Sequence, residues 1–190
     1  MNLSVLLAPD DIAAHTKRLA EEITRDHPEG VVLVGVLKGA LLFLADLCRA
    51  INTIPVSVDF MAISRYAPDS GRVRIVMDLT TDITGCDVVI VEDLVDTGLT
   101  SAYLIAQLRS RGARSVQLCA LLNRLARRIV PTPVKYCGAE IGDVFVLGAG
   151  LHAQDLYRNL PMIVEADRAS VAAEPGIYID QLYGMGKLSG

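Results

Sequence analysis

Apolar and polar residues alternate along this chain in two different rhythms. Continuous apolar runs rich in valine and isoleucine, such as 31–36 and 88–91, are typical of strands buried on both faces of a parallel sheet. Elsewhere apolar residues recur every three or four positions, as Ile12, Leu19 and Ile23 do, which is the spacing of one helix face. The helical segments are 10–27, 40–50 and 101–111, and the strand segments are 31–36, 56–64, 72–75, 88–91, 116–122, 134–137 and 144–147. Strands that alternate with helices predict an α/β domain with a mostly parallel central sheet flanked by helices. Ligands bind such sheets beyond the carboxyl ends of the strands.

Two strand segments differ from the others because their apolar residues alternate with polar ones. In the segment 56–64, Val56, Val58 and Phe60 would share one face. A polar loop leads to the second alternating segment, 72–75. Two strands around a polar loop predict a flap, which in enzymes commonly closes over the active site.

The composition fits a single domain that binds neither nucleic acid nor membrane. With 190 residues, the chain can bury roughly 70% of its unfolded surface in one core. A formal net charge of −4 offers no basic surface for nucleic acid. Residues 31–51 are rich in apolar side chains, but Lys38 near their middle and the division into strand, turn and helix favour a soluble βα unit. The four cysteines show no C-x-x-C spacing, and Cys48 and Cys119 lie in apolar runs, so we expect buried free thiols in a reducing cytoplasm.

The segment 88–101, VVIVEDLVDTGLTS, carries most of the functional information. Its apolar run leads into the carboxylates Glu92, Asp93 and Asp96, and then into a turn of glycine and hydroxyl residues before a helix. The N–H groups and dipole of a helix N-terminus favour an anion such as phosphate. Carboxylates repel phosphate, but they accept hydrogen bonds from sugar hydroxyls and can hold Mg²⁺. The pattern therefore predicts a sugar phosphate, with its phosphate in the turn and its hydroxyls against Glu92 and Asp93.

A simpler interpretation of the same segment is a capped helix after a buried strand, with Asp96 or Thr97 as the N-cap. Each residue taken singly fits that interpretation. Two adjacent acids, a third acid three residues later and the Thr-Gly turn together favour a ligand site. The spacing also differs from the two commoner phosphate motifs, G-x-x-x-x-G-K-[ST] and G-x-G-x-x-G.

The motif resembles the phosphoribosyl pyrophosphate (PRPP) motif of the type I phosphoribosyltransferases. Its Glu-Asp-x-x-Asp-Thr-Gly form is most similar to the hypoxanthine-guanine branch. The similarity extends from about residue 10 to residue 167 and includes, in the same order, the segments 34–47, 58–64, 120–128 and 143–161. It implies the family's α/β fold, with a small hood and a flap over the active site. It also implies one phosphoribosyltransferase domain over residues 1–167. Residues 168–190 lie beyond the resemblance and contain Pro175 and four glycines, so we expect a C-terminal extension that is disordered or docked on a partner subunit.

The resemblance assigns roles to individual residues. Asp96 would accept the proton that the purine sheds, while Glu92 and Asp93 would bind the ribose hydroxyls and the ribose-bound Mg²⁺. The 5′-phosphate would be held by Asp96, Thr97, Gly98, Leu99, Thr100 and Ser101. Pyrophosphate would contact Lys38, Gly39 and Arg158, and the purine would contact Arg124, Phe145 and Val146.

Four positions depart from the usual pattern of the family. The flap has Arg65 and Tyr66 in place of a Ser-Tyr pair, and Arg124 stands where a lysine reads the purine 6-oxo group. Ala149 replaces a common aromatic residue, and His152 replaces an aspartate that binds metal and pyrophosphate. We expect His152 either to donate a hydrogen bond to pyrophosphate beside a weakened second metal position, or to fill space in a loop.

The expected activity is transfer of the phosphoribosyl group of PRPP to a 6-oxopurine, hypoxanthine first and guanine next, in the presence of Mg²⁺. One alternative keeps PRPP and changes the acceptor to xanthine or a non-purine base. Another is a PRPP-sensing regulatory protein on the same fold that binds RNA, which the acidic balance disfavours. The apolar content of 52%, together with the family's habit of pairing through the region around Lys38, predicts a homodimer or homotetramer.

Overall fold

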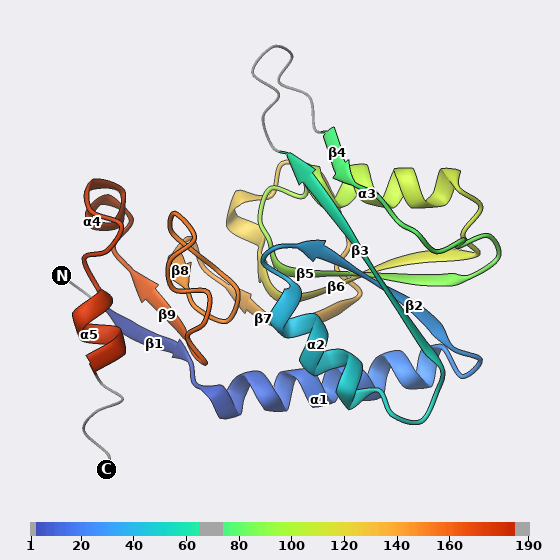
Figure 1. Ribbon diagram of the computed structural model, residues 1–190, viewed down its shortest axis with the longest axis horizontal. Helices are drawn as coiled ribbons and strands as arrows, with labels where there is room; N and C mark the ends of the chain where they lie inside the picture. Colours follow the sequence, from blue (N-terminus) through green and yellow to red (C-terminus); the bar gives the residue numbers. More distant parts are fainter. Residues whose placement is uncertain (1–2, 65–73, 185–190) are drawn as a thin grey trace.

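The computed structural model describes residues 3–64 and 74–184, and its largest element is a six-stranded sheet with helices on both faces (Figure 1). The strand order is β4-β3-β2-β5-β6-β7, and every neighbouring pair is parallel except β3 and β4. The strands are β2 (Val31–Leu37), β3 (Val56–Ser64), β4 (Arg74–Met77), β5 (Asp87–Val95), β6 (Ser115–Arg124) and β7 (Tyr136–Ile141). The predicted α/β fold with a mostly parallel sheet is therefore confirmed.

Helices cover the two faces of this sheet unequally. The helices α1 (Pro9–Asp26) and α2 (Leu41–Ala50) pack on one face, and α3 (Leu99–Ser110) packs on the other (Figure 1). Each face has its own cluster of buried apolar side chains, as expected for a sheet buried on both sides. The four residues Val88–Val91 of β5 are fully buried and contribute alternately to the two clusters. The continuous apolar run in the sequence is thus a central strand.

Strand β5 is longer than its apolar run, and this extension creates room for a ligand. It continues to Val95 by pairing with β6, whereas its register with β2 ends at Val91. Glu92 and Asp93 therefore lie inside the strand rather than after it, at the point where β5 loses one neighbour. The chain moves from β2 to β3 on one side and later to β5 on the other, so this opening is the topological switch point of the sheet.

A second, smaller unit stands beside the carboxyl ends of these strands, and we call it the hood (Figure 1). Its antiparallel sheet has the order β1-β9-β8. The strands are β1 (Ser4–Leu7), β8 (Phe145–Leu147) and β9 (Ile163–Ala166). The sequence predicted β8 but neither β9 nor β1, so the hood sheet was only partly predicted.

The first part of the C-terminal extension belongs to the hood. It contains the short helices α4 (Arg168–Ala173) and α5 (Ile179–Gly184), and the buried side chains of Val171, Tyr178 and Leu182 join the hood core. Residues 168–184 therefore pack on the hood. Docking of the extension on a partner subunit stays a prediction.

The base of the predicted flap is formed by β3 and β4, which pair in antiparallel fashion. Its tip, including Arg65 and Tyr66, lies outside the described residues. In the described part of the chain, no helix combines the length and apolar character needed to cross a membrane. All four cysteines are free, as expected. Cys119 is also fully buried, whereas Cys48 is only half-buried.

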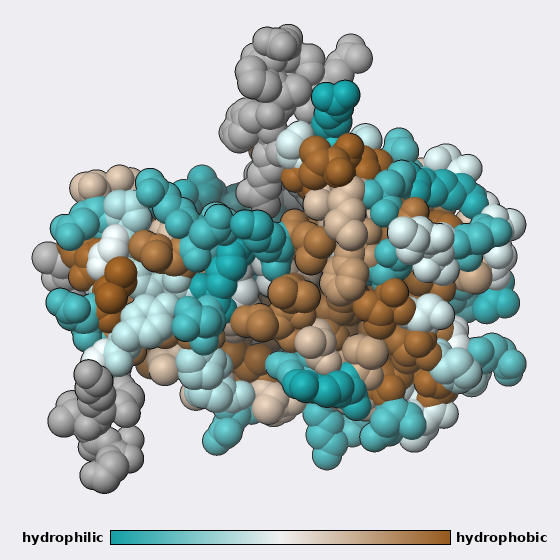
Figure 2. All heavy atoms as spheres, viewed as in Figure 1, coloured by the Kyte–Doolittle hydropathy of each residue, from teal (hydrophilic) through white to brown (hydrophobic). Residues whose placement is uncertain are grey.

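Apolar side chains also gather on one exposed face, over α2 and β3 (Figure 2). The large exposed apolar residues of α2, β3 and β4 are Leu41, Leu42, Val58, Val76 and Met77, and we call this set the apolar patch. Contiguous exposed apolar surface of this kind is typical of a protein interface.

Candidate active site

A cavity of ≈ 460 Å³ lies between the carboxyl ends of the central strands and the hood. It is lined by residues of the ends of β2, β5 and β6, the start of α3, β8 and the loop 148–162 between β8 and β9, which we call the hood loop. These include Lys38, Gly39, Glu92, Asp93, Asp96, Thr100, Arg124, Arg127, Phe145, Val146, His152, Arg158 and Arg168. Another cavity, of ≈ 530 Å³, runs along α3 and contains none of the motif carboxylates. Most of the predicted site residues thus line the first cavity, although they come from distant parts of the sequence. The predicted phosphate residues Thr97, Gly98, Leu99 and Ser101 are not among its lining residues.

The paired carboxylates Glu92 and Asp93 lie at the opening of the sheet, and both are held in place. Glu92 is buried, and its Oε1 atom accepts a hydrogen bond from Ser101 Oγ at 2.6 Å. Asp93 Oδ1 accepts from the N–H of Leu94 at 2.9 Å. Ser101 was predicted to bind the 5′-phosphate, but its hydroxyl is buried and donates to Glu92 instead. In this structure Ser101 therefore orients a carboxylate.

Asp96 and Arg124 form an ion pair next to this cavity. Arg124 Nη1 donates to Asp96 Oδ2 at 3.2 Å, and Arg124 Nη2 donates to the carbonyl oxygen of Val144 at 2.5 Å. The Arg124 side chain is 3% exposed. Asp96 Oδ1 and Arg124 Nε are buried and have no hydrogen-bond partner among the described residues. A buried polar atom without a partner is costly, which suggests that a ligand completes this pair.

The turn between β5 and α3 leaves the start of the helix available to an anion. Gly98, the N-cap residue, has φ 81° and no side-chain cap. A Cβ atom at this position would lie 2.6 Å from the carbonyl oxygen of Val130, so only glycine fits. Of the residues predicted to bind the 5′-phosphate, Thr100 lines the cavity beside Asp96, while Thr97 Oγ1 accepts from the N–H of Leu99 at 3.4 Å. The turn therefore has the form expected of a phosphate cradle, and its binding of the 5′-phosphate stays a prediction.

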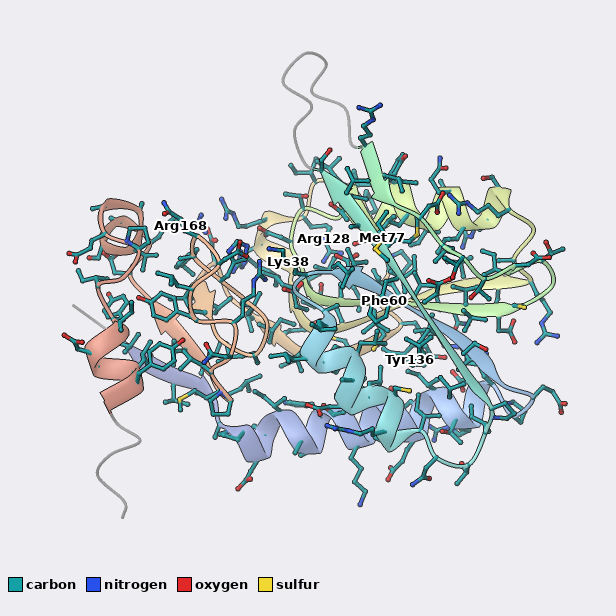
Figure 3. All side chains as sticks on the ribbon, viewed as in Figure 1. Lys38, Phe60, Met77, Arg128, Tyr136 and Arg168 are labelled. Atoms are coloured by element: carbon teal, nitrogen blue, oxygen red, sulfur yellow. The ribbon has the colours of Figure 1, made fainter. Side chains whose placement is uncertain are left out.

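The turn after β2 brings Lys38 and Gly39 to the edge of the same cavity. The peptide bond between Leu37 and Lys38 is cis. A Cβ atom at Gly39 would lie 1.8 Å from Asp93 Oδ2, so this glycine permits the turn to touch the carboxylate. Lys38 extends from the sheet side of the site, whereas Arg168 lies on the hood side (Figure 3).

The hood supplies an aromatic face to the cavity. Phe145 and Val146, at the start of β8, both line it. The guanidinium carbon of Arg168 lies over the Phe145 ring, 5.0 Å from its centroid, and Arg168 also lines the cavity. The sequence analysis missed Arg168, because it lies beyond the family resemblance and its contact with Phe145 is not local.

The hood loop adds a turn that carries charge. The N–H of Asp155 donates to His152 Nδ1 at 3.0 Å, so this ring nitrogen closes the turn. Asp155 Oδ1 accepts from Arg158 Nε and Nη2 at 3.1 and 2.8 Å, and Oδ2 accepts from Lys38 Nζ at 3.3 Å. The hydrogen bonds from Arg158 and then Lys38 hold the pKa of the Asp155 carboxyl below its ordinary value. Asp155 was not predicted from the sequence either. Its position three residues before Arg158 was the signal that could have indicated this ion pair.

Known proteins resemble the chain in both sequence and fold. The phosphoribosyl transferase domain family matches residues 4–155. The hypoxanthine-guanine phosphoribosyltransferase of Bacillus subtilis (strain 168) is 40% identical over 163 residues, covering 84% of this chain and 90% of that protein. The enzyme of the same name from Dictyostelium discoideum is 40% identical over 172 residues, covering 87% of this chain and 96% of that protein.

Solved structures that resemble the chain belong to the same group of enzymes. A hypoxanthine-guanine phosphoribosyltransferase from Bacillus anthracis, with a HEPES molecule in its active site, has a TM-score of 0.82 and 34% identity, covering 86% of this chain and 98% of that chain. The hypoxanthine phosphoribosyl transferase of Trypanosoma cruzi has a TM-score of 0.84 and 37% identity, covering 90% and 94%. The chain therefore belongs to the phosphoribosyl transferase family, in the branch of the hypoxanthine-guanine phosphoribosyltransferases.

Proposed function

We propose that this protein transfers the phosphoribosyl group of PRPP to a 6-oxopurine, releasing pyrophosphate and IMP or GMP. The observation that carries the proposal is the under-satisfied Asp96 carboxylate beside the phosphate cradle. One of its oxygens is paired with Arg124, and the other lacks a donor among the described residues. A purine N–H would supply that donor. Rotation of the Asp96 carboxylate about χ2 can present either of its oxygens to the cavity.

In the proposed reaction, the bond between ribose C1 and the pyrophosphate oxygen breaks while a purine ring nitrogen attacks C1. The proton that the purine loses passes to Asp96, and Arg124 donates to the purine 6-oxo group. Phe145 would stack on the base, and the backbone of Val146 would contact its edge. The start of α3, including Thr100, holds the 5′-phosphate, so the ribose is fixed between two anchored ends.

The residues present fit a Mg²⁺ ion that is bound jointly with the substrate. Mg²⁺ prefers oxygen donors and is usually held by one or two carboxylates together with substrate oxygens. Glu92 and Asp93 supply adjacent carboxylates at the cavity. Within residues 3–64 and 74–184, no cluster of three or more His, Cys, Asp or Glu side chains is placed to hold a metal by itself. When bound, the ion would neutralise charge on PRPP and on the leaving pyrophosphate.

The proposal is tested by measuring nucleotide formation from PRPP and Mg²⁺ with hypoxanthine, guanine, xanthine, adenine and uracil. We expect hypoxanthine and guanine to give the highest kcat/KM. If xanthine or uracil is the best acceptor, the assignment of the PRPP site stands and the assignment of the acceptor base is wrong. No nucleotide with any of the five bases would contradict the enzymatic function.

Changing His152 to aspartate should lower the Mg²⁺ concentration that gives half-maximal rate. Imidazole nitrogen suits Mg²⁺ poorly, whereas a carboxylate at the cavity wall would add an oxygen donor. Aspartate can also accept the hydrogen bond from the N–H of Asp155, so the turn should persist. A Mg²⁺ titration of the initial rate makes the comparison, with His152→Asn as a control that adds an oxygen but no charge. Identical titrations for all three proteins would place His152 outside the metal subsite.

We also propose that the chain forms a homodimer through the apolar patch, and this is a separate prediction. The patch continues from α2, which follows the Lys38 turn, onto β3 and β4. Light scattering at micromolar concentration should give twice the chain mass or more. Val58→Asp, within the patch, should shift the protein towards monomer because it buries a charge, whereas Val5→Asp on the exposed hood surface should not. A monomeric wild-type protein would contradict the assembly.

A further inference from the structure

The carboxylate of Asp155 lies between the two cations assigned above to pyrophosphate. Lys38 approaches it from the turn after β2, and Arg158 approaches it from the hood loop. The three donor atoms lie 2.8–3.3 Å from its two oxygens. Both cations line the cavity, so a group on the protein already occupies the charges that a diphosphate would need.

These contacts can be exchanged, because the carboxylate that makes them is exposed to solvent. The Asp155 and Lys38 side chains are 61% and 69% exposed, whereas the Arg158 side chain is 22% exposed. Ion pairs between exposed single charges contribute little to stability, since water and salt screen them. A diphosphate carries more negative charge and more acceptor oxygens than one carboxylate, so it can replace Asp155 on both cations.

The site would survive the loss of Asp155 from its cations. Arg158 is also held by a hydrogen bond from Nη1 to the carbonyl oxygen of Gly150 at 2.6 Å, so it stays at the cavity. The Asp155 backbone is fixed by its own hydrogen bond to His152 and by a left-handed conformation with φ 64°. The turn therefore presents the carboxylate at the cavity edge without help from Lys38 or Arg158.

We propose that Asp155 is an internal anion of the pyrophosphate subsite, which holds Lys38 and Arg158 in the ligand-free protein and is displaced by the diphosphate. The inference rests on the proposed function, because that function assigns the two cations to pyrophosphate. Its consequence is a weakened hold on the leaving group: each time pyrophosphate binds, the contacts to Asp155 must be given up. Asp155 would thus set the balance between capture of PRPP and release of product.

The test is the affinity of the full-length protein for inorganic pyrophosphate with Mg²⁺, measured by isothermal titration calorimetry. The informative variant is Asp155→Asn, because asparagine tolerates a positive φ well and the turn should be unchanged. We expect pyrophosphate to bind about 3- to 10-fold more tightly to the variant, as two exposed ion pairs no longer compete. The KM for PRPP should fall by a similar factor.

A matched control removes the same charge elsewhere near the cavity. Asp143 pairs with Arg127 at 3.6 Å, and Arg127 lines the cavity, so Asp143→Asn tests a general electrostatic effect. The control should change the pyrophosphate affinity less than twofold (about 0.4 kcal/mol). An equal gain in both variants would overturn the internal-anion role in favour of net charge.

The remaining outcomes distinguish a failure of this inference from a failure of the proposed function. If wild-type protein binds pyrophosphate and Asp155→Asn binds it equally or more weakly, Asp155 positions the cations and the inference fails alone. If wild-type protein shows no binding of pyrophosphate, the subsite assignment and this inference both fail. A thermal unfolding curve of Asp155→Asn that matches the wild type ensures that a loss of binding reports on the site.

Discussion

Replacing Asp96 by asparagine should lower kcat by about 10²- to 10⁴-fold, the usual effect of removing a general base. The amide cannot take the purine proton, yet its oxygen can still accept the hydrogen bond from Arg124. The pair would therefore stay in place while its chemistry is lost. Steady-state kinetics with hypoxanthine measure the effect, and the affinity for PRPP, measured separately, should change little.

A suitable control for this variant is again Asp143→Asn, which makes the same substitution beside Arg127 and outside the cavity lining. Its kcat should stay within about twofold of the wild type, as for most surface substitutions. If Asp96→Asn turns over at a near-normal rate, Asp96 has no part in the chemical step.

Discrimination against adenine should be the largest effect of all, with kcat/KM for hypoxanthine on the order of 10⁴-fold higher. A guanidinium only donates hydrogen bonds, so Arg124 can satisfy a 6-oxo group but would face the donors of a 6-amino group. Its burial sharpens the choice, because Arg124 Nε is buried without a partner and a 6-amino group would bring a further donor instead of an acceptor. Competition between the two bases for PRPP gives the ratio directly.

Two arginines make a matched pair for this experiment. Arg124→Met removes the buried guanidinium and should reduce the preference for hypoxanthine to a small factor. Arg127→Met removes the neighbouring guanidinium, which is 39% exposed and lies 3.8 Å from Asp96, and should leave the preference intact. Adenine as the preferred substrate of the wild-type protein would disprove the assignment of Arg124.

The central sheet, and the position of the carboxylates at its edge, could be predicted from the sequence because their signals are local. The apolar run 88–91 is the buried part of β5, and Glu92, Asp93 and Asp96, which follow it in the chain, line the cavity. The end of β5 was misplaced, since acids usually mark the end of a strand while pairing with β6 carries this one to Val95.

The hood half of the site could not be predicted in the same way. Strands β1 and β9 each have only four residues, and β9 lies between β1 and β8, so both depend on distant partners and neither segment alone has a strand signal strong enough to recognise. The contact of Asp155 with Lys38 joins loops far apart in the sequence, and that of Arg168 with Phe145 depends on how α4 packs on the hood. The roles of all these residues stay predictions.

The pairing of β1 with β9 has a consequence for how the protein is made. Segments near opposite ends of the chain form this hood sheet, while the strands from β2 to β7 lie between them. On the ribosome, the central sheet can fold as it emerges, but β1 must wait for a partner that is synthesised after all six strands of that sheet. The nascent protein thus forms the turn between β5 and α3 first, and the hood side of the cavity is completed only after β9 has been made.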